Sequence, residues 1–173
     1  MRTGCSGGLQ VNQPWPFRAY LQAPDKTSMA FTADGWLITG DFGTMDAQGR
    51  VKVLGCGAAL IVTGGLNVYP KEVEEHLNRL PGVVDSAVIG LPHEEYGEAV
   101  FAVVEVGEHE AALTERGMRD ILRRSLTGYK VPKRVVIVTT LPRNALGKVK
   151  KQALRDRYQS HFGAAKSDAN GSA

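Results

Sequence analysis

Two valine-rich segments, residues 83–91 and 98–106, constrain the fold of this 173-residue chain more than any other feature of its sequence. Each has the length and the β-branched content of a strand, and the PHEEYG sequence between them is typical of a loop. A third β-branched segment, at 135–139, predicts a further strand. The sequence therefore predicts a small β-sheet in the second half of the chain.

Helical patterns flank these strands. After Pro70, apolar residues recur at helical spacing until the Pro81–Gly82 pair ends the pattern. With a short helix at 152–158, the order β, α, β, β, α, β, α from residue 51 onward predicts an α+β domain of about 100 residues, with its helices on one face of the sheet. Thr114 is typical of an N-cap for the middle helix, whose apolar face would carry Met118, Ile121, Leu122 and Leu126.

Residues 1–54 carry a separate β-rich pattern. Asp46 and Gly49 are the residues that a type I turn favours between two strands. The first strand has no upstream partner, so we expect residues 1–54 to be the partly frayed remnant of a larger domain. We place a compact domain at 55–160, in which residues 60–69 fit either a strand pair or a loop, and a disordered tail at 161–173. The strands predicted within the remnant are 9–11, 36–38, 42–45 and 50–54.

The composition argues against several classes of protein. With 43% hydrophobic and 23% charged residues, the chain is near the globular average. A net charge of +3, with basic residues near the C-terminus interleaved with acidic and apolar ones, does not indicate nucleic-acid binding. No apolar run approaches the ~18 residues of a membrane span and the first residues lack the apolar stretch of a secretory signal, so we expect a cytoplasmic protein without a membrane partner. The two cysteines and four histidines show no metal-ligand spacing.

The loop LPRNALGKVKK, residues 141–151, holds the first candidate for chemistry. Gly147 allows the backbone to turn so that Lys148 projects from a loop tip instead of lying along a strand. A positive charge on a flexible loop suits reactions in which negative charge develops on phosphate or carboxylate oxygens. The alternative is a solvated Gly–Lys turn without a function.

Two further segments suit nucleotide chemistry. In LITGD, Asp41 follows a glycine turn and can accept two hydrogen bonds from a vicinal diol such as that of ribose, although it would equally serve to cap the turn. In TGGLNVYPKEVE, Gly64 and Gly65 allow close approach to a ligand, and the following helix N-terminus offers free amides to an anion. This spacing matches neither common glycine motif, so the segment alone is a weak phosphate site.

Taken in this order, the three segments resemble the last sequence blocks of the adenylate-forming superfamily, the acyl-CoA synthetases and their relatives. FRAYLQAPDKTSMAFTADGWLITGD is similar to the end of the family's large N-terminal domain. VVDSAVIGLPHEEYGEAVFAVV and YKVPKRV are similar to the interior of its small C-terminal domain. The resemblance covers residues 8–158, and within the superfamily GGLNVYPKEVE and LPRNALGKVKK resemble malonyl-CoA synthetases and medium-chain acyl-CoA ligases.

The resemblance implies a ligase with a two-step reaction. A carboxylate attacks the α-phosphate of ATP, which binds with Mg, to give an acyl-adenylate and pyrophosphate; coenzyme A then displaces AMP to form an acyl-CoA thioester. The family's C-terminal domain is a lid that rotates between the steps. By this resemblance Lys148 is the adenylation lysine, Asp41 binds the ribose hydroxyls, and Gly65, next to Gly64, lies where the pantetheine thiol passes.

The sequence departs from the family pattern at the segment between the two domains. Where the family has G-R-x-K-D, this chain has GCGAA. Cys56 thus replaces an arginine that fixes the nucleotide and the hinge, and Ala58 and Ala59 replace charged residues. A thiol does not imitate a guanidinium, whose hydrogen bonds contribute ~1.5 to 3 kcal/mol each. The chain also contains neither the family's phosphate loop nor the acid pocket that the family builds in its N-terminal domain.

The sequence therefore indicates the C-terminal part of an ATP-dependent acyl-CoA synthetase, with malonate as a candidate acid, encoded as a fragment or a truncated reading frame. We expect it to be inactive alone, to bind ATP, AMP and coenzyme A only weakly by itself, and to need a large N-terminal adenylation domain as its partner. The alternative is a non-catalytic lid-like module, or a degenerate remnant, that docks onto a separate large domain; GCGAA favours degeneracy, whereas the intact LPRNALGK opposes it. Nucleic-acid binding by the basic C-terminal helix is a third interpretation, which the balancing acidic residues oppose.

Overall fold

The computed structural model describes residues 6–12, 17–107 and 113–163 of the chain. Contacts between residues divide it into two compact units, Met1–Ala59 and Leu60–Ala173. Among the described residues, the first unit is a small sheet with one short helix, and the second is a larger sheet with three α-helices. No described helix has the length and apolar character needed to cross a membrane.

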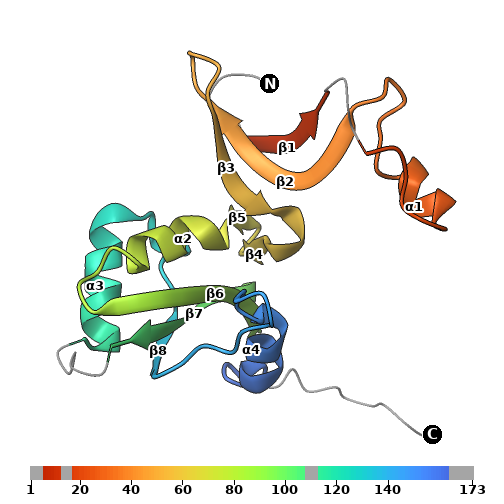
Figure 1. Ribbon diagram of the computed structural model, residues 1–173. Coiled ribbons are helices and arrows are strands. Elements are labelled where there is room, and N and C mark those ends of the chain that lie inside the picture. The colour runs from red at the N-terminus through yellow and green to blue at the C-terminus, as the bar shows by residue number, and fades with distance from the viewer. Residues whose placement is uncertain (1–5, 13–16, 108–112, 164–173) are drawn as a thin grey trace, which may run out of the picture. The chain divides into compact units, whose positions relative to one another are not determined.

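The first unit is a three-stranded antiparallel sheet in the order β1-β2-β3 (Figure 1). Its strands are β1 (Ser6–Val11), β2 (Leu37–Met45) and β3 (Val51–Cys56), and the helix α1 (Pro24–Ser28) comes between the first two in sequence. The predicted turn between β2 and β3 is confirmed, because the Gly49 amide donates to the Asp46 carbonyl at 3.1 Å and the Asp46 carboxylate accepts a hydrogen bond from the Arg50 amide at 2.9 Å.

Strand β2 corrects the sequence prediction, which divided it into two strands at 36–38 and 42–45. Gly40 has a φ of 78°, and the register with β3 shifts between Phe42 and Gly43. Pairing with β1 nevertheless continues on both sides of Gly40, and pairing with β3 begins directly after it, at Asp41. A glycine within a paired strand marks a bend or bulge as readily as an end, so Gly40 does not interrupt the strand.

The second unit contains a five-stranded sheet built around β7. The long hairpin of β6 and β7 pairs Val83 with Val106 at one end and His93 with Gly97 at the other, which confirms the two predicted strands. β8 runs parallel to β7 on its other side, and β4 meets β7 only at the Thr63–Gly97 pair. The strands are β4 (Ile61–Thr63), β5 (Leu66–Val68), β6 (Val83–His93), β7 (Gly97–Val106) and β8 (Arg134–Val138).

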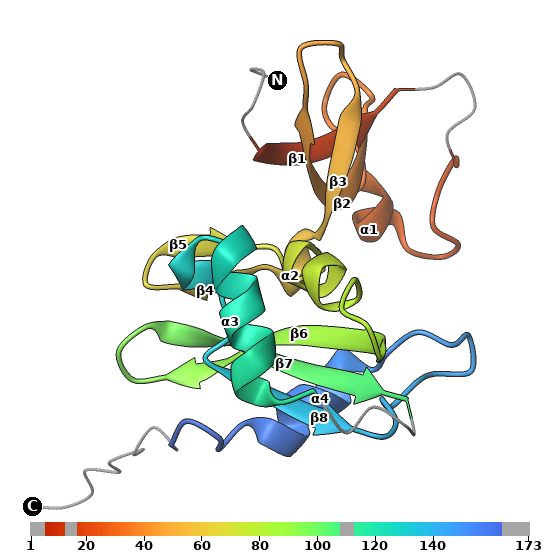
Figure 2. The ribbon, with the colours of Figure 1, turned by 90° about the vertical axis from the view of Figure 1, so that its left-hand side faces the viewer.

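The helices of this unit are α2 (Pro70–Leu77), α3 (Glu115–Ser125) and α4 (Lys151–Tyr158), with single 3₁₀ turns at Gly128–Lys130 and, in the first unit, at Gly57–Ala59. The predicted cap of α3 is confirmed, since the Thr114 hydroxyl accepts a hydrogen bond from the Gly117 amide at 3.1 Å. Figure 2 shows α2 and α3 on the near side of the sheet.

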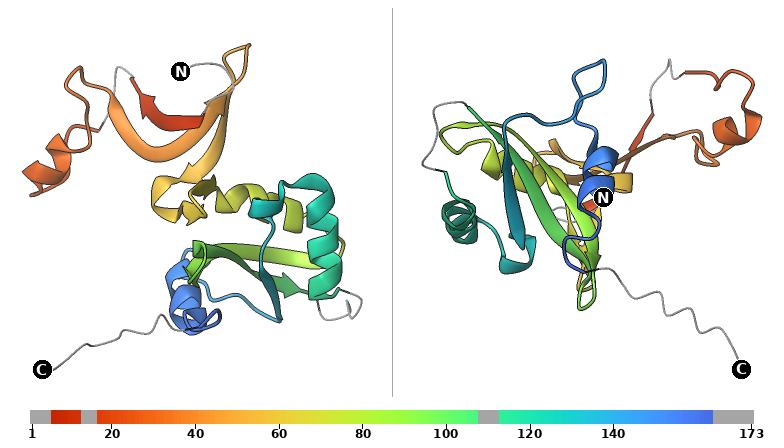
Figure 3. Two further views of the ribbon diagram at one scale, coloured as in Figure 1. Left: turned by 180° about the vertical axis from the view of Figure 1, so that it is seen from behind. Right: turned by 90° about the horizontal axis from the view of Figure 1, so that it is seen from below.

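Both faces of the sheet are covered, which corrects the prediction of helices on one face only. Alternate residues of β7 belong to two separate apolar clusters. Val100, Ala102 and Val104 pack with residues of α2 and α3, whereas Phe101 and Val103 pack with Leu154 of α4. Figure 3 shows α3 and α4 on opposite sides of the sheet. A strand that is buried on both sides has a continuous apolar sequence instead of an alternating one. The valine-rich sequences of β6 and β7 have this pattern.

The segment after α4 continues along the second face of the sheet. The rings of His161 and Phe162 contact the ring of Phe101, with centroids 4.9 and 6.0 Å away. Of the tail predicted at 161–173, residues 164–173 lie outside the described part of the chain.

Candidate functional site

The predicted lysine loop is a tight turn that is held by several backbone hydrogen bonds. Arg143 and Val149 form an isolated antiparallel bridge, and the amide of Asn144 donates to the carbonyl of Lys148 at 2.9 Å. The Asn144 side-chain oxygen accepts from the amides of Leu146 and Lys148, at 3.0 and 2.9 Å. Gly147 has a φ of 79°, which only glycine adopts readily. The turn therefore has a defined backbone, and the freedom expected of a flexible loop belongs to the lysine side chain.

Lys148 lies at the tip of this turn and is exposed. Its ammonium group has no hydrogen-bonding or ionic partner among the described residues. Lys130 and Lys151, in contrast, make ion pairs at 2.8 and 2.6 Å with Glu72 and Glu74. Lys148 thus presents an uncompensated positive charge on a fixed backbone, which suits an anionic ligand or a developing negative charge.

The turn is attached to the sheet through Arg143. One guanidinium nitrogen, Nη1, donates to the carbonyl of Gly147 at 3.1 Å, and the other, Nη2, contacts Asp85 at 2.7 Å and Glu105 at 3.3 Å. The hydrogen bond that Arg143 donates to Asp85, together with the nearby charge of both carboxylates, raises the pKa of Arg143 above its ordinary value. Sequence analysis did not identify Arg143, because its partners lie on β6 and β7, far away in sequence.

The Gly64–Gly65 segment is the turn of the β4–β5 hairpin, so of the two interpretations left open for residues 60–69 the strand pair is correct. Both glycines have positive φ, 55° and 76°, as a two-residue hairpin turn requires. The Gly64 amide donates to the carbonyl of Tyr96 at 2.9 Å, and a Cβ atom added at Gly65 would meet nothing within 4 Å. The backbone at Gly65 is therefore open to close approach.

The two turns lie at opposite ends of the β6–β7 hairpin. The glycine turn is tied to Tyr96, in the loop that joins the strands, whereas the lysine turn is tied to Asp85 and Glu105, near their free ends. Eight residues of extended β6 separate Asp85 from His93, which corresponds to roughly 25 Å. Figure 2 shows the β4–β5 hairpin and the blue loop before α4 at opposite sides of the second unit.

The remaining predicted site residues belong to the first unit. Asp41 lies on β2 opposite Cys56 of β3, its carboxylate makes no hydrogen bond or ion pair with the described residues, and the Cys56 thiol is exposed. Ala58 and Ala59 follow in the 3₁₀ turn. The structure therefore brings Asp41 and Cys56 together, and places Gly64, Gly65 and Lys148 in the other unit.

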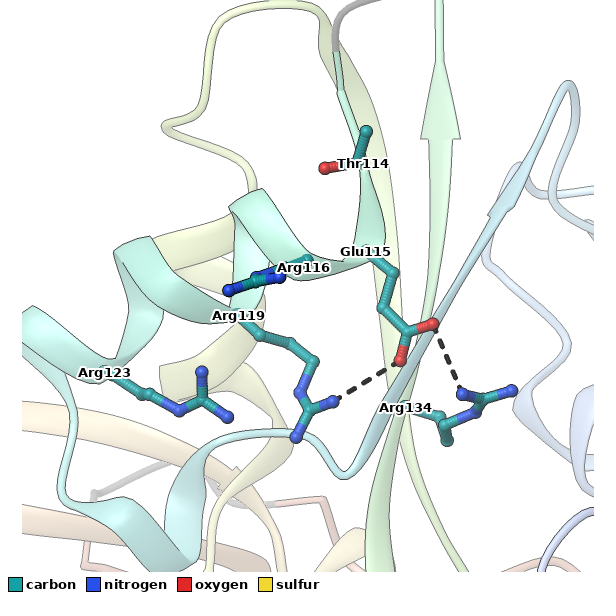
Figure 4. Close-up of a pocket in the computed structure, with 6 residues that line it drawn as sticks. All are labelled: Thr114, Glu115, Arg116, Arg119, Arg123 and Arg134. Atoms are coloured by element: carbon teal, nitrogen blue, oxygen red, sulfur yellow. Dashed lines mark ion pairs between the residues drawn. The ribbon is translucent and has the colours of Figure 1, made fainter.

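An arginine-lined hollow on α3 was not expected from the sequence. It has a volume of about 490 Å³ (Figure 4). Glu115 bridges Arg119 and Arg134, each 3.6 Å away, and Asp120 pairs with Arg116 and Arg123, so four arginines and two acids leave a net charge of +2. The Nε atom of Arg119 is buried without a hydrogen-bond partner. The lining residues are Thr114, Glu115, Arg116, Arg119, Arg123 and Arg134.

Comparison with known proteins identifies the domain that carries the lysine turn. The family model of the AMP-binding enzyme C-terminal domain matches residues 72–148. Residues 72–148 therefore correspond to this C-terminal domain. The resemblance found in the sequence is thereby confirmed, and the matched C-terminal domain has the α+β architecture described above.

Proteins similar to this chain include CoA ligases. A 3-[(3aS,4S,7aS)-7a-methyl-1,5-dioxo-octahydro-1H-inden-4-yl]propanoyl:CoA ligase of Rhodococcus jostii is 42% identical over 90% of this chain and 30% of the relative. A long-chain-fatty-acid–CoA ligase of Yersinia pestis is also 42% identical, over 88% of this chain and 27% of the relative. The crystal structure of ATP-bound MatB from Rhodopseudomonas palustris superposes with a TM-score of 0.84 at 43% identity, covering 94% of this chain and 32% of MatB. The chain therefore spans less than a third of the length of these relatives.

Proposed function

We propose that this chain supplies the lid of an ATP-dependent acyl-CoA ligase, in which Lys148 stabilises the transition state of adenylate formation. The observation that carries the proposal is the free ammonium of Lys148 on a braced turn. When a carboxylate attacks the α-phosphate of ATP, negative charge builds on the oxygens of both groups. A cation that a braced backbone presents to those oxygens lowers the barrier because it stabilises the negative charge as it develops.

The positions of the two turns support a two-step cycle. The lysine turn and the glycine turn lie at opposite ends of the β6–β7 hairpin, where Asp85 and His93 are roughly 25 Å apart along β6. A single reaction centre held by a large adenylation domain cannot face both ends at once. The lid would therefore present Lys148 for adenylation and then rotate to bring Gly64 and Gly65 beside the thiol of coenzyme A.

Asp41 supplies the nucleotide contact in this proposal. Its carboxylate has no partner among the described residues and so keeps its acceptor oxygens for the two ribose hydroxyls. ATP would arrive with Mg, and the phosphates and the acid would be held by the large adenylation domain. Malonate remains the candidate acid from the sequence resemblance, but relatives that are both 42% identical to this chain are named for an indane-type propanoate and for long-chain fatty acids. This part of the protein thus does not select the acid.

A hybrid enzyme tests the proposal. In it, this chain replaces the matching part of the Yersinia pestis long-chain-fatty-acid–CoA ligase. We expect Lys148→Ala to slow pyrophosphate release with a long-chain acid at least about 100-fold, while preformed acyl-adenylate is still converted to acyl-CoA. Lys150→Ala, which removes an exposed lysine two residues away, is the matched control and should retain both steps. Equal pyrophosphate release by the Lys148→Ala hybrid would refute the assignment.

A non-catalytic lid-like module is the second candidate, and the GCGAA segment favours it. Cys56 is an exposed thiol at the end of β3, where the family places an arginine. In that case the hybrid would bind a preformed acyl-adenylate but release no pyrophosphate from ATP. Cys56→Arg in the same hybrid separates the two candidates, because recovery of pyrophosphate release would show that only the hinge has degenerated.

A further inference from the structure

Among the residues that the structure describes, Arg143 connects the tip of the lysine turn directly to the sheet. The bonds made by Asn144 stay within residues 144–148, so they shape the turn without fixing its place on the domain. Arg143 reaches outward from the same turn. Its guanidinium links the carbonyl of Gly147, the residue before Lys148, to Asp85 on β6 and Glu105 on β7.

Burial and geometry favour this link over an ordinary surface ion pair. The side chains of Arg143, Asp85 and Glu105 are 34%, 29% and 15% exposed, so this contact is less exposed than the Arg50–Asp46 pair, at 79% and 37%. Glu105 also accepts a hydrogen bond from the amide of Leu141 at 2.9 Å, which fixes the start of the loop. Three acceptors surround one planar group, and the rigid fork of arginine can serve all three, whereas a lysine ammonium is a point charge on a flexible stem.

We propose that Arg143 is the positioning residue for Lys148: it fixes the turn relative to the β6–β7 hairpin and so sets where the lysine ammonium stands. The inference rests on the proposed function for its catalytic consequence, but its structural part is independent of it. Lys151, at the end of the loop next to α4, pairs with Glu74 at 2.6 Å. Among the described residues, its side chain makes no hydrogen bond or ion pair with the tip of the turn. Arg143 therefore governs the tip, and Lys151 the start of α4.

The structural part is tested on the whole chain by ¹⁵N relaxation. We expect the backbone order parameters of Leu146, Gly147 and Lys148 to fall from about 0.85 to below about 0.6 in Arg143→Gln, while those of β6 and β7 stay near the rigid value. Arg143→Lys should not restore order, because one ammonium cannot span the three acceptors. The matched control is Arg50→Gln, which removes an arginine that pairs with Asp46 in another hairpin turn. Unchanged order at Gly147 and Lys148 in Arg143→Gln would overturn the proposal.

A second variant guards against general destabilisation of the domain. Asp85→Asn keeps Arg143 and removes the charge of its closest carboxylate partner, at 2.7 Å. We expect a smaller loss of order at Gly147 and Lys148 than in Arg143→Gln, with β7 unaffected. If order falls equally along β6 and β7 in both variants, Arg143 stabilises the sheet instead of positioning the turn, and the proposal is wrong.

The catalytic part uses the hybrid enzyme and separates the two half-reactions. A displacement of about 1 Å at a catalytic group can cost about 100-fold in rate. Arg143→Gln should therefore lower kcat for pyrophosphate release by about that factor with little change in KM for ATP, and leave conversion of preformed acyl-adenylate intact. Equal losses in both half-reactions would indicate an unstable domain and contradict a positioning role. If Lys148→Ala has no effect on pyrophosphate release, the proposed function is wrong. The relaxation experiment on Arg143→Gln still tests the structural part of the proposal, because it does not depend on activity.

Discussion

Replacing Leu154 by alanine should destabilise the second unit by about 3 kcal/mol. Leu154 is the buried residue of α4, with 1% of its surface exposed, and it belongs to the apolar cluster that contains Phe101 and Val103 of β7. It therefore reports on whether α4 covers the second face of the sheet, the feature that sequence analysis missed.

The size of this effect follows from the contacts of Leu154. The substitution removes three buried carbon atoms, which at about 0.8 kcal/mol each amounts to roughly 2.4 kcal/mol. The neighbours on β7 are held by strand pairing on both sides, so they cannot move far to fill the space. A residual cavity of about 40 Å³ adds about 1 kcal/mol, and the sum lies within the range of about 2 to 5 kcal/mol that buried leucine-to-alanine changes cost.

Urea denaturation followed by far-UV circular dichroism measures the loss. Both tryptophans, Trp15 and Trp36, belong to the first unit, so tryptophan fluorescence is not a suitable signal for the second. Gln152→Ala, at an exposed position of the same helix, should change the free energy of unfolding by no more than about 0.5 kcal/mol. Leu154→Met, which keeps the volume, should cost less than about 1.5 kcal/mol. A loss below about 1 kcal/mol for Leu154→Ala would refute the packing of α4 on this face.

Three further predictions concern local contacts. Thr114→Ala removes the cap of α3 and should lower the free energy of unfolding by about 1 kcal/mol in urea denaturation, whereas Thr114→Ser retains the hydroxyl acceptor and should cost little. The hydrogen bonds from Arg50 hold the pKa of Asp46 below its ordinary value. Their contribution to stability is therefore present above the pKa of Asp46 in the unfolded chain, and it is lost as the pH falls through the pKa of Asp46 in the folded chain. An NMR titration of Asp46 should show a higher pKa in Arg50→Gln. Lys130 and Glu72 are paired at 2.8 Å, and their side chains are only 20% and 24% exposed. A double-mutant cycle with Lys130→Met and Glu72→Gln should therefore give a coupling energy of about 1 kcal/mol. A coupling energy near zero would mean that this pair behaves like an exposed one.

Local signals predicted the elements of the second unit, but not the number of its layers. The hairpin of β6 and β7, the cap at Thr114 and the turn at Asp46 depend on residues close together in sequence, and the structure contains all three. The side of the sheet that each helix covers depends on contacts between distant residues. α4 has only Leu154 fully buried, so its apolar pattern is too short to assign it to a face. The valine-rich segments themselves indicated that both faces of the sheet are covered, because a strand that is apolar on both sides must be buried on both sides.

The residues of the candidate site also differ in whether local or distant contacts define them. Sequence patterns identified Gly147, Lys148 and the Gly64–Gly65 pair, because adjacent residues determine the geometry of a turn. Arg143 was not, since its role arises only when β6 and β7 bring Asp85 and Glu105 to one end of the hairpin. The residue that acts and the residue that positions it thus follow different rules: the first must project from a turn, and the second must reach from that turn to a rigid element. A sequence motif that contains a lysine after a glycine therefore indicates where a charge is presented, whereas the contacts of its neighbours decide how accurately it is held.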